Sequence, residues 1–243
     1  MLDGGSGADT YHFGRGYGRD VVLENASHEM NGNLVVLDAG IRQEDIVVRK
    51  SGNDLILKLA DTTDELVLRG AATYLSGSSF SSVRFADGTQ WDYVTLQSRA
   101  MIGTAGDDRI EGFDAKIEVI SGGAGNDTLI GGVGPDTYLF GRGDGHDVIF
   151  DRDTNAGNVD TLRFSAGVLA SDVVLVRDGR DLAAHISDTG ESITIKGFYQ
   201  WEPGGWHQRI ERMEFEDGTV WLSTDIESRA ILAPQDYRLI GSA

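Results

Sequence analysis

One block of glycine, aspartate and aromatic residues occurs twice in this chain, and that duplication limits the possible folds more than any other feature. The block Gly-Gly-Ser-Gly-Ala-Asp-Thr-Tyr at 4–11 returns 127 residues later, at 131–138, as Gly-Gly-Val-Gly-Pro-Asp-Thr-Tyr. Further segments match at the same offset, or after a three-residue insertion in the last case: 13–16 and 140–143, 18–21 and 145–148, 52–55 and 179–182, and 85–91 and 215–221. The chain is therefore two copies of one unit.

Each unit consists of a glycine-rich block followed by a segment rich in predicted strands. The first unit, 1–102, comprises glycine-rich turns at 3–22 and a flanking β segment at 23–102. The second unit, 103–243, comprises a glycine-rich block at 103–150, a flanking β segment at 151–238 and the start of a third unit at 239–243. Because the first unit has no counterpart of 103–130, we expect the sequence to be a piece of a longer tandem array.

A shorter pattern, G-G-x-G-x-D-x-U-x with U a large apolar residue, recurs inside the glycine-rich blocks. It is found at 4–12, 122–130 and 131–139, and in a looser form at 103–110. Glycine permits positive φ angles, so that such a loop can turn its carbonyl oxygens inward, and the aspartate adds a carboxylate. Calcium takes six to eight oxygens of these kinds. Isolated copies would suit ordinary hairpin turns, but consecutive and duplicated copies favour a calcium site.

These nonapeptides resemble the RTX (repeats-in-toxin) family, also called haemolysin-type calcium-binding repeats. The resemblance implies an all-β fold, a parallel β-roll (β-solenoid) in which two nonapeptides make one turn and calcium lies between loops n and n + 2. The cofactor would then be Ca²⁺, several ions per chain. The residues that the resemblance implies as metal ligands or ligand-loop positions are Asp9, Asp20, Asp108, Asp127, Asp136, Asp147, Gly5, Gly7, Gly106, Gly123, Gly125, Asn126, Gly132, Gly134 and Gly145.

The spacing of the aspartates divides them between the two edges of such a roll. Asp108, Asp127 and Asp147 are 19 and 20 residues apart and should stack on one edge, with Asp136 on the other. The buried U positions should be Tyr11, Val22, Ile110, Leu129, Tyr138 and Ile149.

Two parts of the roll predict weaker sites. The residue that should precede Asp136 on its edge falls near 118, but 113–121 lacks the glycines, so that a complete site is not expected there. Asp9 and Asp20 should lie on opposite edges of a shorter roll, which predicts sites that are incomplete or completed by a neighbouring segment.

Alternating apolar residues predict several strands in both flanking segments. Hairpin turns are expected at 51–54 and 178–181 and at the Asp-Gly pairs 87–88 and 217–218. A capping box at Thr224–Glu227 predicts a short helix to about Leu232. We expect these segments to cover the open ends of each roll.

Composition and motifs exclude several classes of function. The formal net charge of −18 opposes binding to nucleic acid, and the chain has no cysteine for disulfides or Cys-type zinc sites. No apolar run approaches the roughly 18 residues of a membrane-spanning helix. Because neither His-Glu-x-x-His nor Gly-x-Ser-x-Gly occurs, we expect no enzyme.

The acidic run Asp151–Asn155 begins like an EF-hand, but Ala156 and Leu162 stand where that motif requires glycine and glutamate. We interpret the run as a bare acidic loop rather than an added calcium site.

A second unusual segment carries Trp201 and Trp206, which we expect to pack against the strands.

The sequence thus predicts a secreted, extracellular calcium-binding module that folds outside the cell and acts as a stabilising scaffold. Its expected partners are calcium ions and, as the resemblance implies, a type I secretion apparatus that acts through the parent protein. The alternative is an adhesin module whose flanking segment binds a glycan or protein through Trp201 and Trp206.

Overall fold

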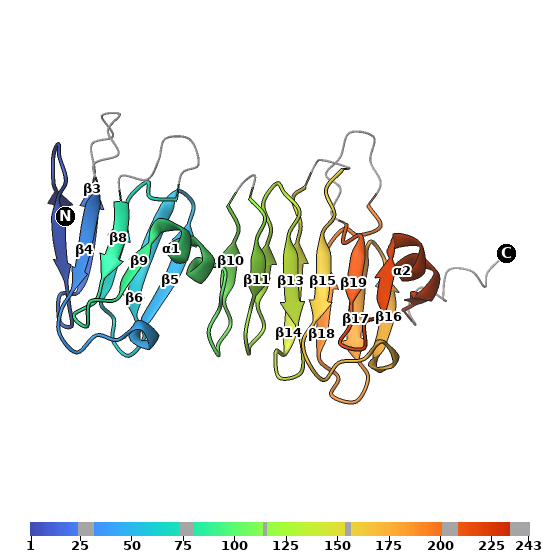
Figure 1. The fold of residues 1–243 in the computed structure, drawn as a ribbon. Coiled ribbons are helices and arrows are strands. Elements are labelled where there is room, and N and C mark those ends of the chain that lie inside the picture. The colour runs from blue at the N-terminus through green and yellow to red at the C-terminus, as the bar shows by residue number, and fades with distance from the viewer. Residues whose placement is uncertain (24–31, 73–79, 114–115, 154–156, 201–208, 234–243) are drawn as a thin grey trace. The chain divides into compact units, whose positions relative to one another are not determined.

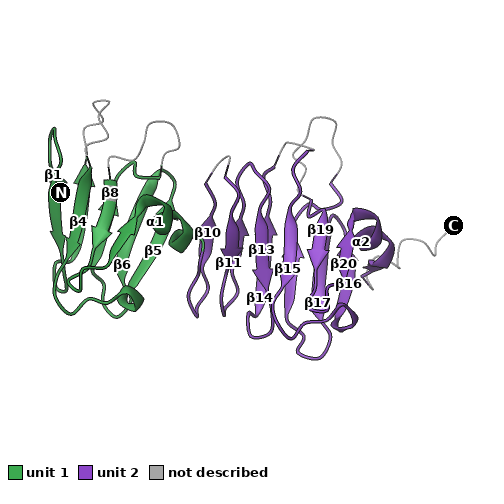
Figure 2. Ribbon diagram, viewed as in Figure 1, with its two compact units in different colours: residues 1–101 green, residues 102–243 purple. Residues whose placement is uncertain are grey.

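The computed structural model describes residues 1–23, 32–72, 80–113, 116–153, 157–200 and 209–233. The chain divides into two compact units, Met1–Met101 and Ile102–Ala243 (Figure 1, Figure 2). Both are strand-rich and built from two sheets with parallel pairing, which confirms the predicted all-β roll. The predicted third-unit start at 239–243 and the Trp201/Trp206 segment lie outside the described residues.

The second unit contains a seven-stranded and a five-stranded sheet. The larger has the order β10(Arg109–Glu111), β12(Thr128–Ile130), β14(His146–Phe150), β18(Ser192–Ile195), β17(Asp181–Ile186), β16(Val173–Asp178), β21(Ile231–Leu232). The smaller has the order β11(Val119–Ser121), β13(Thr137–Phe140), β15(Thr161–Phe164), β19(Arg212–Glu214), β20(Val220–Leu222). From β10 to β15 the chain crosses from one sheet to the other after every strand, as a roll requires (Figure 1).

The strands that follow the nonapeptides continue these same sheets. β18 pairs in parallel with β14, and β19 pairs in parallel with β15. Antiparallel pairing begins only beyond them, at β17 and β20. The flanking segment is therefore an extension of the roll, with longer connections; antiparallel strands follow in each sheet, and β21 pairs in parallel with β16 at the end of the larger one.

The first unit repeats this plan with fewer strands. One sheet has the order β1(Leu2–Asp3), β3(Arg19–Leu23), β7(Glu65–Leu68), β6(Asp54–Leu59), β5(Ile46–Ser51). The other has the order β2(Thr10–Phe13), β4(Asn33–Leu37), β8(Phe80–Arg84), β9(Gln90–Asp92). Short 3₁₀ helices, η1(Gln43–Asp45) and η2(Ala170–Asp172), precede β5 and β16.

The core lies between the two sheets of each unit and contains the apolar residue of every repeat. All six predicted U positions are confirmed as buried, at 7% exposure or less: Tyr11, Val22, Ile110, Leu129, Tyr138 and Ile149. The predicted hairpins are also confirmed, since Ser51 pairs with Asp54 and Asp178 with Asp181 across two-residue turns.

The helix prediction needs correction. The helix α2(Ser223–Arg229) begins one residue before Thr224 and ends before Leu232, which belongs to β21 instead. Its first turn is held by Asp225, whose carboxylate accepts the Leu222 N–H at 3.1 Å. The corresponding helix of the first unit, α1(Tyr93–Ala100), was not predicted, although Asp92 caps it by accepting the Thr95 N–H at 2.8 Å.

Candidate metal centre

Three aspartates stack on one edge of the second unit, as their spacing predicts. Parallel pairing of β10, β12 and β14 places the residues before or within each strand in register. The Asp108 N–H donates to Asp127 Oδ1 at 2.7 Å, and the Asp127 N–H donates to Asp147 Oδ1 at 2.9 Å. Each loop is thereby joined to the loop two strands further along the chain.

Glycine is required where these loops approach one another. Gly123 has a φ of 84°, and a Cβ there would lie 2.3 Å from the carbonyl oxygen of Thr104. Gly145 has a φ of 88°, and its Cβ would lie 2.1 Å from the Gly125 carbonyl oxygen. Backbone carbonyl oxygens of one loop therefore face the glycines of the next, which is the close stacking that oxygen ligation between loops requires.

The carboxylates of this edge are buried with unused oxygens. Asp127 is 1% and Asp147 2% exposed, and the Oδ2 atom of each has no hydrogen-bond partner. Burial, with the nearby Asp127 carboxylate, raises the pKa of Asp147 to about 7, and burial also raises the pKa of Asp127. A buried anion needs a compensating charge, so that these residues fit a divalent cation with a preference for oxygen ligands.

The other predicted loop residues take different places. Gly106, Gly125, Gly132 and Gly134 lie in the loops of the second unit, and Gly5 and Gly7 lie in the first. Asn126 links neighbouring loops, since its N–H donates to Asp107 Oδ1 at 2.8 Å and its Oδ1 accepts the His146 N–H at 3.1 Å. The side-chain oxygen of Asn126 is thus already used by the backbone.

The opposite edge carries a longer ladder of acidic residues than predicted. The Glu118 N–H donates to Asp136 Oδ1 at 3.0 Å, and the Asp136 N–H donates to Asp160 Oδ1 at 2.7 Å. The Asp160 N–H in turn donates to Glu211 Oε2 at 2.9 Å. Glu118 thus takes the ladder position before Asp136, although its loop lacks the glycines of the motif.

Glu118, Asp160 and Glu211 were missed, but the sequence contains a signal for them. Each stands two residues before a fully buried apolar side chain, as the repeat aspartates do: Ile120, Leu162 and Met213. Burial, together with Glu118 or Asp160, raises the pKa values of Asp136 and Glu211 to about 7. This edge is therefore as strongly charged and as desolvated as the first.

The acidic run at 151–155, interpreted as a bare acidic loop rather than an added calcium site, is partly buried. Asp151 is 0% exposed and Asp153 2% exposed, whereas Arg152 between them is exposed. The Asp153 N–H donates to Asp151 Oδ1 at 3.0 Å. Burial and the adjacent Asp160 carboxylate raise the pKa of Asp151 well above its usual range.

The first unit keeps the ladder hydrogen bond and one buried carboxylate oxygen without a hydrogen-bond partner, Asp9 Oδ2, but its glycine loops are not closely stacked. The Asp9 N–H donates to Asn33 Oδ1 at 2.7 Å, and a Cβ at Gly5 or Gly7 would meet nothing within 4 Å. Asp9 precedes β2 and Asp20 lies in β3, in separate sheets, which confirms that they belong to opposite edges. Among the described residues, no second nonapeptide loop stacks on the loop of Asp9 or on that of Asp20.

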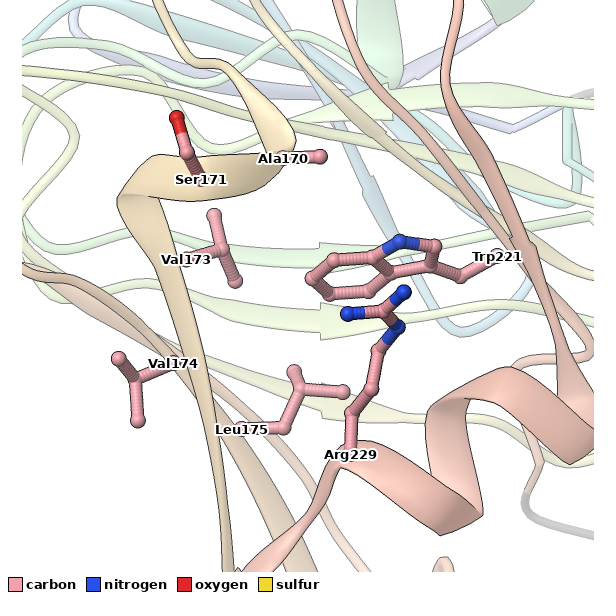
Figure 3. A pocket seen from close by; sticks show the side chains of 7 residues that line it. All are labelled: Ala170, Ser171, Val173, Val174, Leu175, Trp221 and Arg229. Atoms are coloured by element: carbon pink, nitrogen blue, oxygen red, sulfur yellow. The ribbon is translucent and has the colours of Figure 1, made fainter.

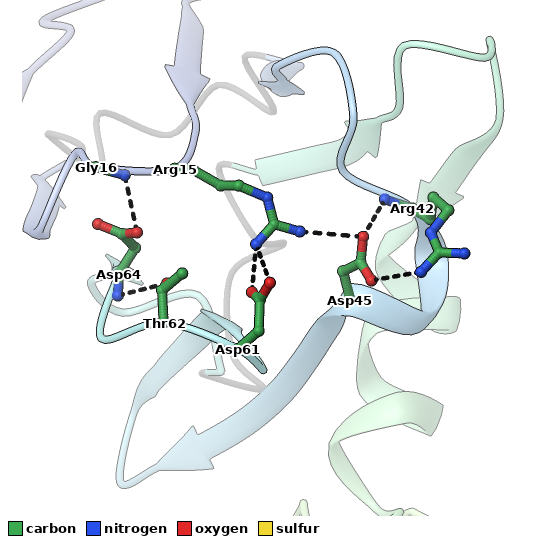
Figure 4. Close-up of polar contacts among 7 residues, drawn as sticks. All are labelled: Arg15, Gly16, Arg42, Asp45, Asp61, Thr62 and Asp64. Carbon is green, nitrogen blue, oxygen red and sulfur yellow. Dashed lines mark hydrogen bonds and ion pairs between the residues drawn. The ribbon is translucent and has the colours of Figure 1, made fainter.

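Carboxylates distant in the sequence hold the turn between β2 and β3 in the first unit and the corresponding turn between β13 and β14 in the second. Asp64 accepts the N–H groups of Gly16 at 2.9 Å and Gly18 at 2.6 Å, and Arg15 lies between Asp45 and Asp61, with which it forms ion pairs (Figure 4). The second unit repeats this arrangement: Glu191 accepts the Gly143 N–H at 2.7 Å, and Arg142 pairs with Asp172 and Asp188. These contacts are structural and were not predicted.

Comparison with known families agrees with this geometry. A family model described as the RTX calcium-binding nonapeptide repeat matches residues 1–19, 101–116 and 114–149. Another, described as the haemolysin-type calcium binding protein related domain, matches residues 54–95 and 181–225. The chain therefore carries RTX calcium-binding repeats. It is a calcium-binding RTX repeat domain, and such domains are structural modules.

Individual relatives of the RTX chain are more distant. The iron-regulated protein FrpA of Neisseria meningitidis serogroup C is 30% identical over 83 residues, which is 34% of this chain and 7% of that protein. The structure of the extracellular lipase LipA from Serratia marcescens matches 94% of this chain and 38% of that chain, at 20% identity and a TM-score of 0.27. The RTX chain spans a minor part of the length of both proteins, and the structural match is too weak to support any inference.

Other features of the RTX chain offer little chemistry. Among the described residues, no three Asp, Glu, His or Cys side chains converge to hold a metal by themselves. No helix in the described ranges is long and apolar enough to cross a membrane.

A pocket of about 320 Å³ lies at Trp221, with the Arg229 guanidinium 4.5 Å from the indole centre (Figure 3). Its lining has no general base or acid: Ala170, Ser171, Val173, Val174, Leu175, Trp221 and Arg229.

Proposed function

We propose that this chain is a calcium-dependent folding module of a secreted protein and acts there as a stabilising scaffold without catalytic activity. The observation that supports this proposal is the pair of buried carboxylate oxygens, Asp127 Oδ2 and Asp147 Oδ2, which have no hydrogen-bond partner beside close-packed glycine loops. Calcium bound between the loops by Asp127, Asp147 and nearby carbonyl groups would neutralise these charges.

The energetics of the metal-free chain support folding that depends on calcium. The formal net charge is −18, and many of the acids of the second unit are desolvated when it folds. The glycine-rich loops also lose much conformational freedom on folding. Free calcium at 100 times the Kd of a site adds about 2.7 kcal/mol of stability per site. A few such sites contribute as much as the usual net stability of a domain.

This dependence on calcium suits a protein that folds after export. RTX repeat proteins are typically secreted, and calcium is scarce inside cells and abundant outside them. The chain would stay largely unfolded in the cytosol, pass through a type I secretion apparatus as part of its parent protein, and fold at its extracellular location. The alternative adhesin function depends on Trp201 and Trp206, which lie outside the described residues, and no described contact favours it.

Circular dichroism of the full chain during a calcium titration tests the proposal. We expect a transition from disordered to β-rich spectra with calcium and a much smaller response to magnesium at the same concentration. The variant Asp127→Asn should require more calcium, whereas Asp217→Asn, in an exposed turn, should not. A chain that is fully β-folded in a chelator and unresponsive to calcium would refute the proposal.

A further inference from the structure

The second unit contains a buried pair of carboxylates that no nonapeptide motif explains. We propose that Asp151 and Asp160 bind one further Ca²⁺ ion, on the edge of the roll that carries Asp136. This inference rests on the proposed function, since it adds a site to a chain that folds around calcium. The site would lie outside the residues that the repeat pattern selects.

The position of the two residues follows from the strand order. Asp151 comes directly after β14, and Asp160 comes directly before β15. Because β15 pairs in parallel with β13, with Thr161 opposite Thr137, Asp160 lies beside Asp136. Asp160 therefore takes the next position on this edge after Asp136, with its Oδ1 accepting the Asp136 N–H at 2.7 Å.

Both carboxylates are buried, and they contact each other. Asp151 is 0% and Asp160 2% exposed, and their carboxylates lie within hydrogen-bonding distance of one another. Asp151 Oδ1 accepts the Asp153 N–H at 3.0 Å, whereas Asp151 Oδ2 is buried without a hydrogen-bond partner. Among the described residues, no ion pair joins either carboxylate to a lysine, arginine or histidine. Two adjacent buried anions of this kind require a cation or a shared proton.

Comparison with the first unit shows that the residue at position 160 can accept its hydrogen bond without carrying a charge. The counterpart of Asp160 is Asn33, and that of Asp136 is Asp9. Asn33 Oδ1 accepts the Asp9 N–H at 2.7 Å, the same bond that Asp160 Oδ1 accepts from Asp136 at 2.7 Å. A neutral side chain is therefore sufficient for the ladder.

The charge of Asp160 thus requires another explanation, and its neighbour Asp151 supplies one. The sequence position that corresponds to Asp151 in the first unit is Glu24, so that the paired aspartates are confined to the second unit. Calcium suits such a place because it accepts two carboxylates together with backbone carbonyl groups and water. Such a ligand set is compatible with the lack of any three converging acidic side chains in the described ranges.

Counting bound ions tests this site directly. The full chain, the variants Asp151→Asn and Asp160→Asn and their double mutant would be loaded with calcium and measured by native mass spectrometry. We expect each single variant to bind one ion fewer than the unaltered chain. The double mutant should also lose one ion, not two, because both residues serve one site. Asp160→Asn introduces the side chain that the first unit already uses, so that the ladder hydrogen bond is preserved.

The controls distinguish this inference from the proposed function. Asp217→Asn removes one exposed carboxylate of the same unit and should leave the ion count unchanged. If Asp127→Asn loses calcium while Asp151→Asn and Asp160→Asn keep the full count, the further site is wrong and the proposed function stands. If the unaltered chain binds no calcium, the proposed function itself is wrong.

A second measurement does not depend on the variants. Crystals of the unaltered chain grown with calcium should show an anomalous difference peak between the carboxylates of Asp151 and Asp160. Carboxylates that share a short hydrogen bond, with no peak between them while peaks occur beside Asp127, would overturn the inference in favour of a shared proton.

Discussion

The two units have the same strand plan, but they differ in how their buried acids are neutralised. In the described part of the first unit, Asp64 is the one buried acid, and hydrogen bonds from Gly16 and Gly18 lower its pKa, while Asp9 is half-buried with one buried oxygen that has no hydrogen-bond partner. In the described part of the second unit eight acids are buried: Asp108, Glu118, Asp127, Asp136, Asp147, Asp151, Asp153 and Asp160. Burial raises the pKa of several of them, Asp136 and Asp147 among them.

This contrast shows that the roll can be stabilised in two ways. Where backbone N–H groups surround a carboxylate, as at Asp64, the protein itself stabilises the charge. Where carboxylates stack on one another, as at Asp127 and Asp147, an external cation must do so. The second unit should therefore depend on calcium far more than the first.

Removal of calcium should have the largest effect and should separate the two units. In a chelator we expect the amide protons of 109–164 to exchange rapidly, because each lost site costs about 2.7 kcal/mol relative to calcium at 100 times Kd. The strands β5, β6 and β7 should keep more of their protection. Hydrogen exchange read by mass spectrometry would check this, and equal loss of protection in both units would contradict the comparison.

Closing the space between loops should have the next largest effect. Gly123→Ala places a Cβ 2.3 Å from the Thr104 carbonyl oxygen, whereas Gly5→Ala meets nothing within 4 Å. The two glycines have similar positive φ angles, 84° and 79°, so that both variants carry the conformational cost of about 1 kcal/mol.

The clash should therefore lower the free energy of unfolding of Gly123→Ala further, by about 2–4 kcal/mol in total. Chemical denaturation in excess calcium would measure both variants. Equal destabilisation by Gly123→Ala and Gly5→Ala would show that the loops of the second unit do not pack as closely as the structure indicates.

Neutralising one carboxylate in each unit sharpens the comparison further. Asp127→Asn should raise the calcium concentration at half-folding roughly tenfold, because a charged ligand worth about 1.5 kcal/mol or more is lost. Asp64→Asn should lower the free energy of unfolding less than Asp127→Asn does. It should leave the number of bound ions unchanged, since Asp64 accepts hydrogen bonds from backbone N–H groups. Calcium titrations followed by circular dichroism would distinguish the two, and a change in ion count for Asp64→Asn would contradict this assignment.

The residues that were predicted correctly are those whose signal is local. The nonapeptide pattern placed Asp108, Asp127 and Asp147 on one edge, because a regular spacing in the sequence becomes a regular stack in a roll. The hairpin turn at Gly52, which has a φ of 57°, was also predicted correctly, since glycine at that position favours a two-residue hairpin.

What was missed depends on partners far away in the sequence. Glu211 reaches the ladder through the N–H of Asp160, 51 residues earlier, and no local pattern specifies that pairing. The burial of Asp151 was not predicted, because a run of acidic residues is usually solvated and no local pattern marks one of them as buried. Alternation likewise indicated strands such as β18 without showing that it would pair with β14.

The dependence of metal-free stability on pH should be the smallest effect, and it should have opposite signs in the two units. The raised pKa values of Asp136 and Asp147, about 7, mean that the folded second unit holds these protons more tightly than the unfolded chain. This contribution to stability is fully present below the ordinary carboxyl pKa of about 4 and is lost as the pH rises from there to about 7.

Asp64 behaves in the opposite way, because its pKa is lowered in the folded state. Its contribution is present above the ordinary carboxyl pKa and is lost as the pH falls through the lowered value. In a chelator, acidification from pH 7.5 to 5 should therefore increase hydrogen-exchange protection of β12, β13 and β14 while leaving β5–β7 nearly unchanged, after correction for the intrinsic exchange rates. In saturating calcium the gain in the second unit should vanish, because the bound ion already compensates the charges. A gain of the same size with and without calcium would mean that protons, rather than calcium, neutralise the stacked aspartates.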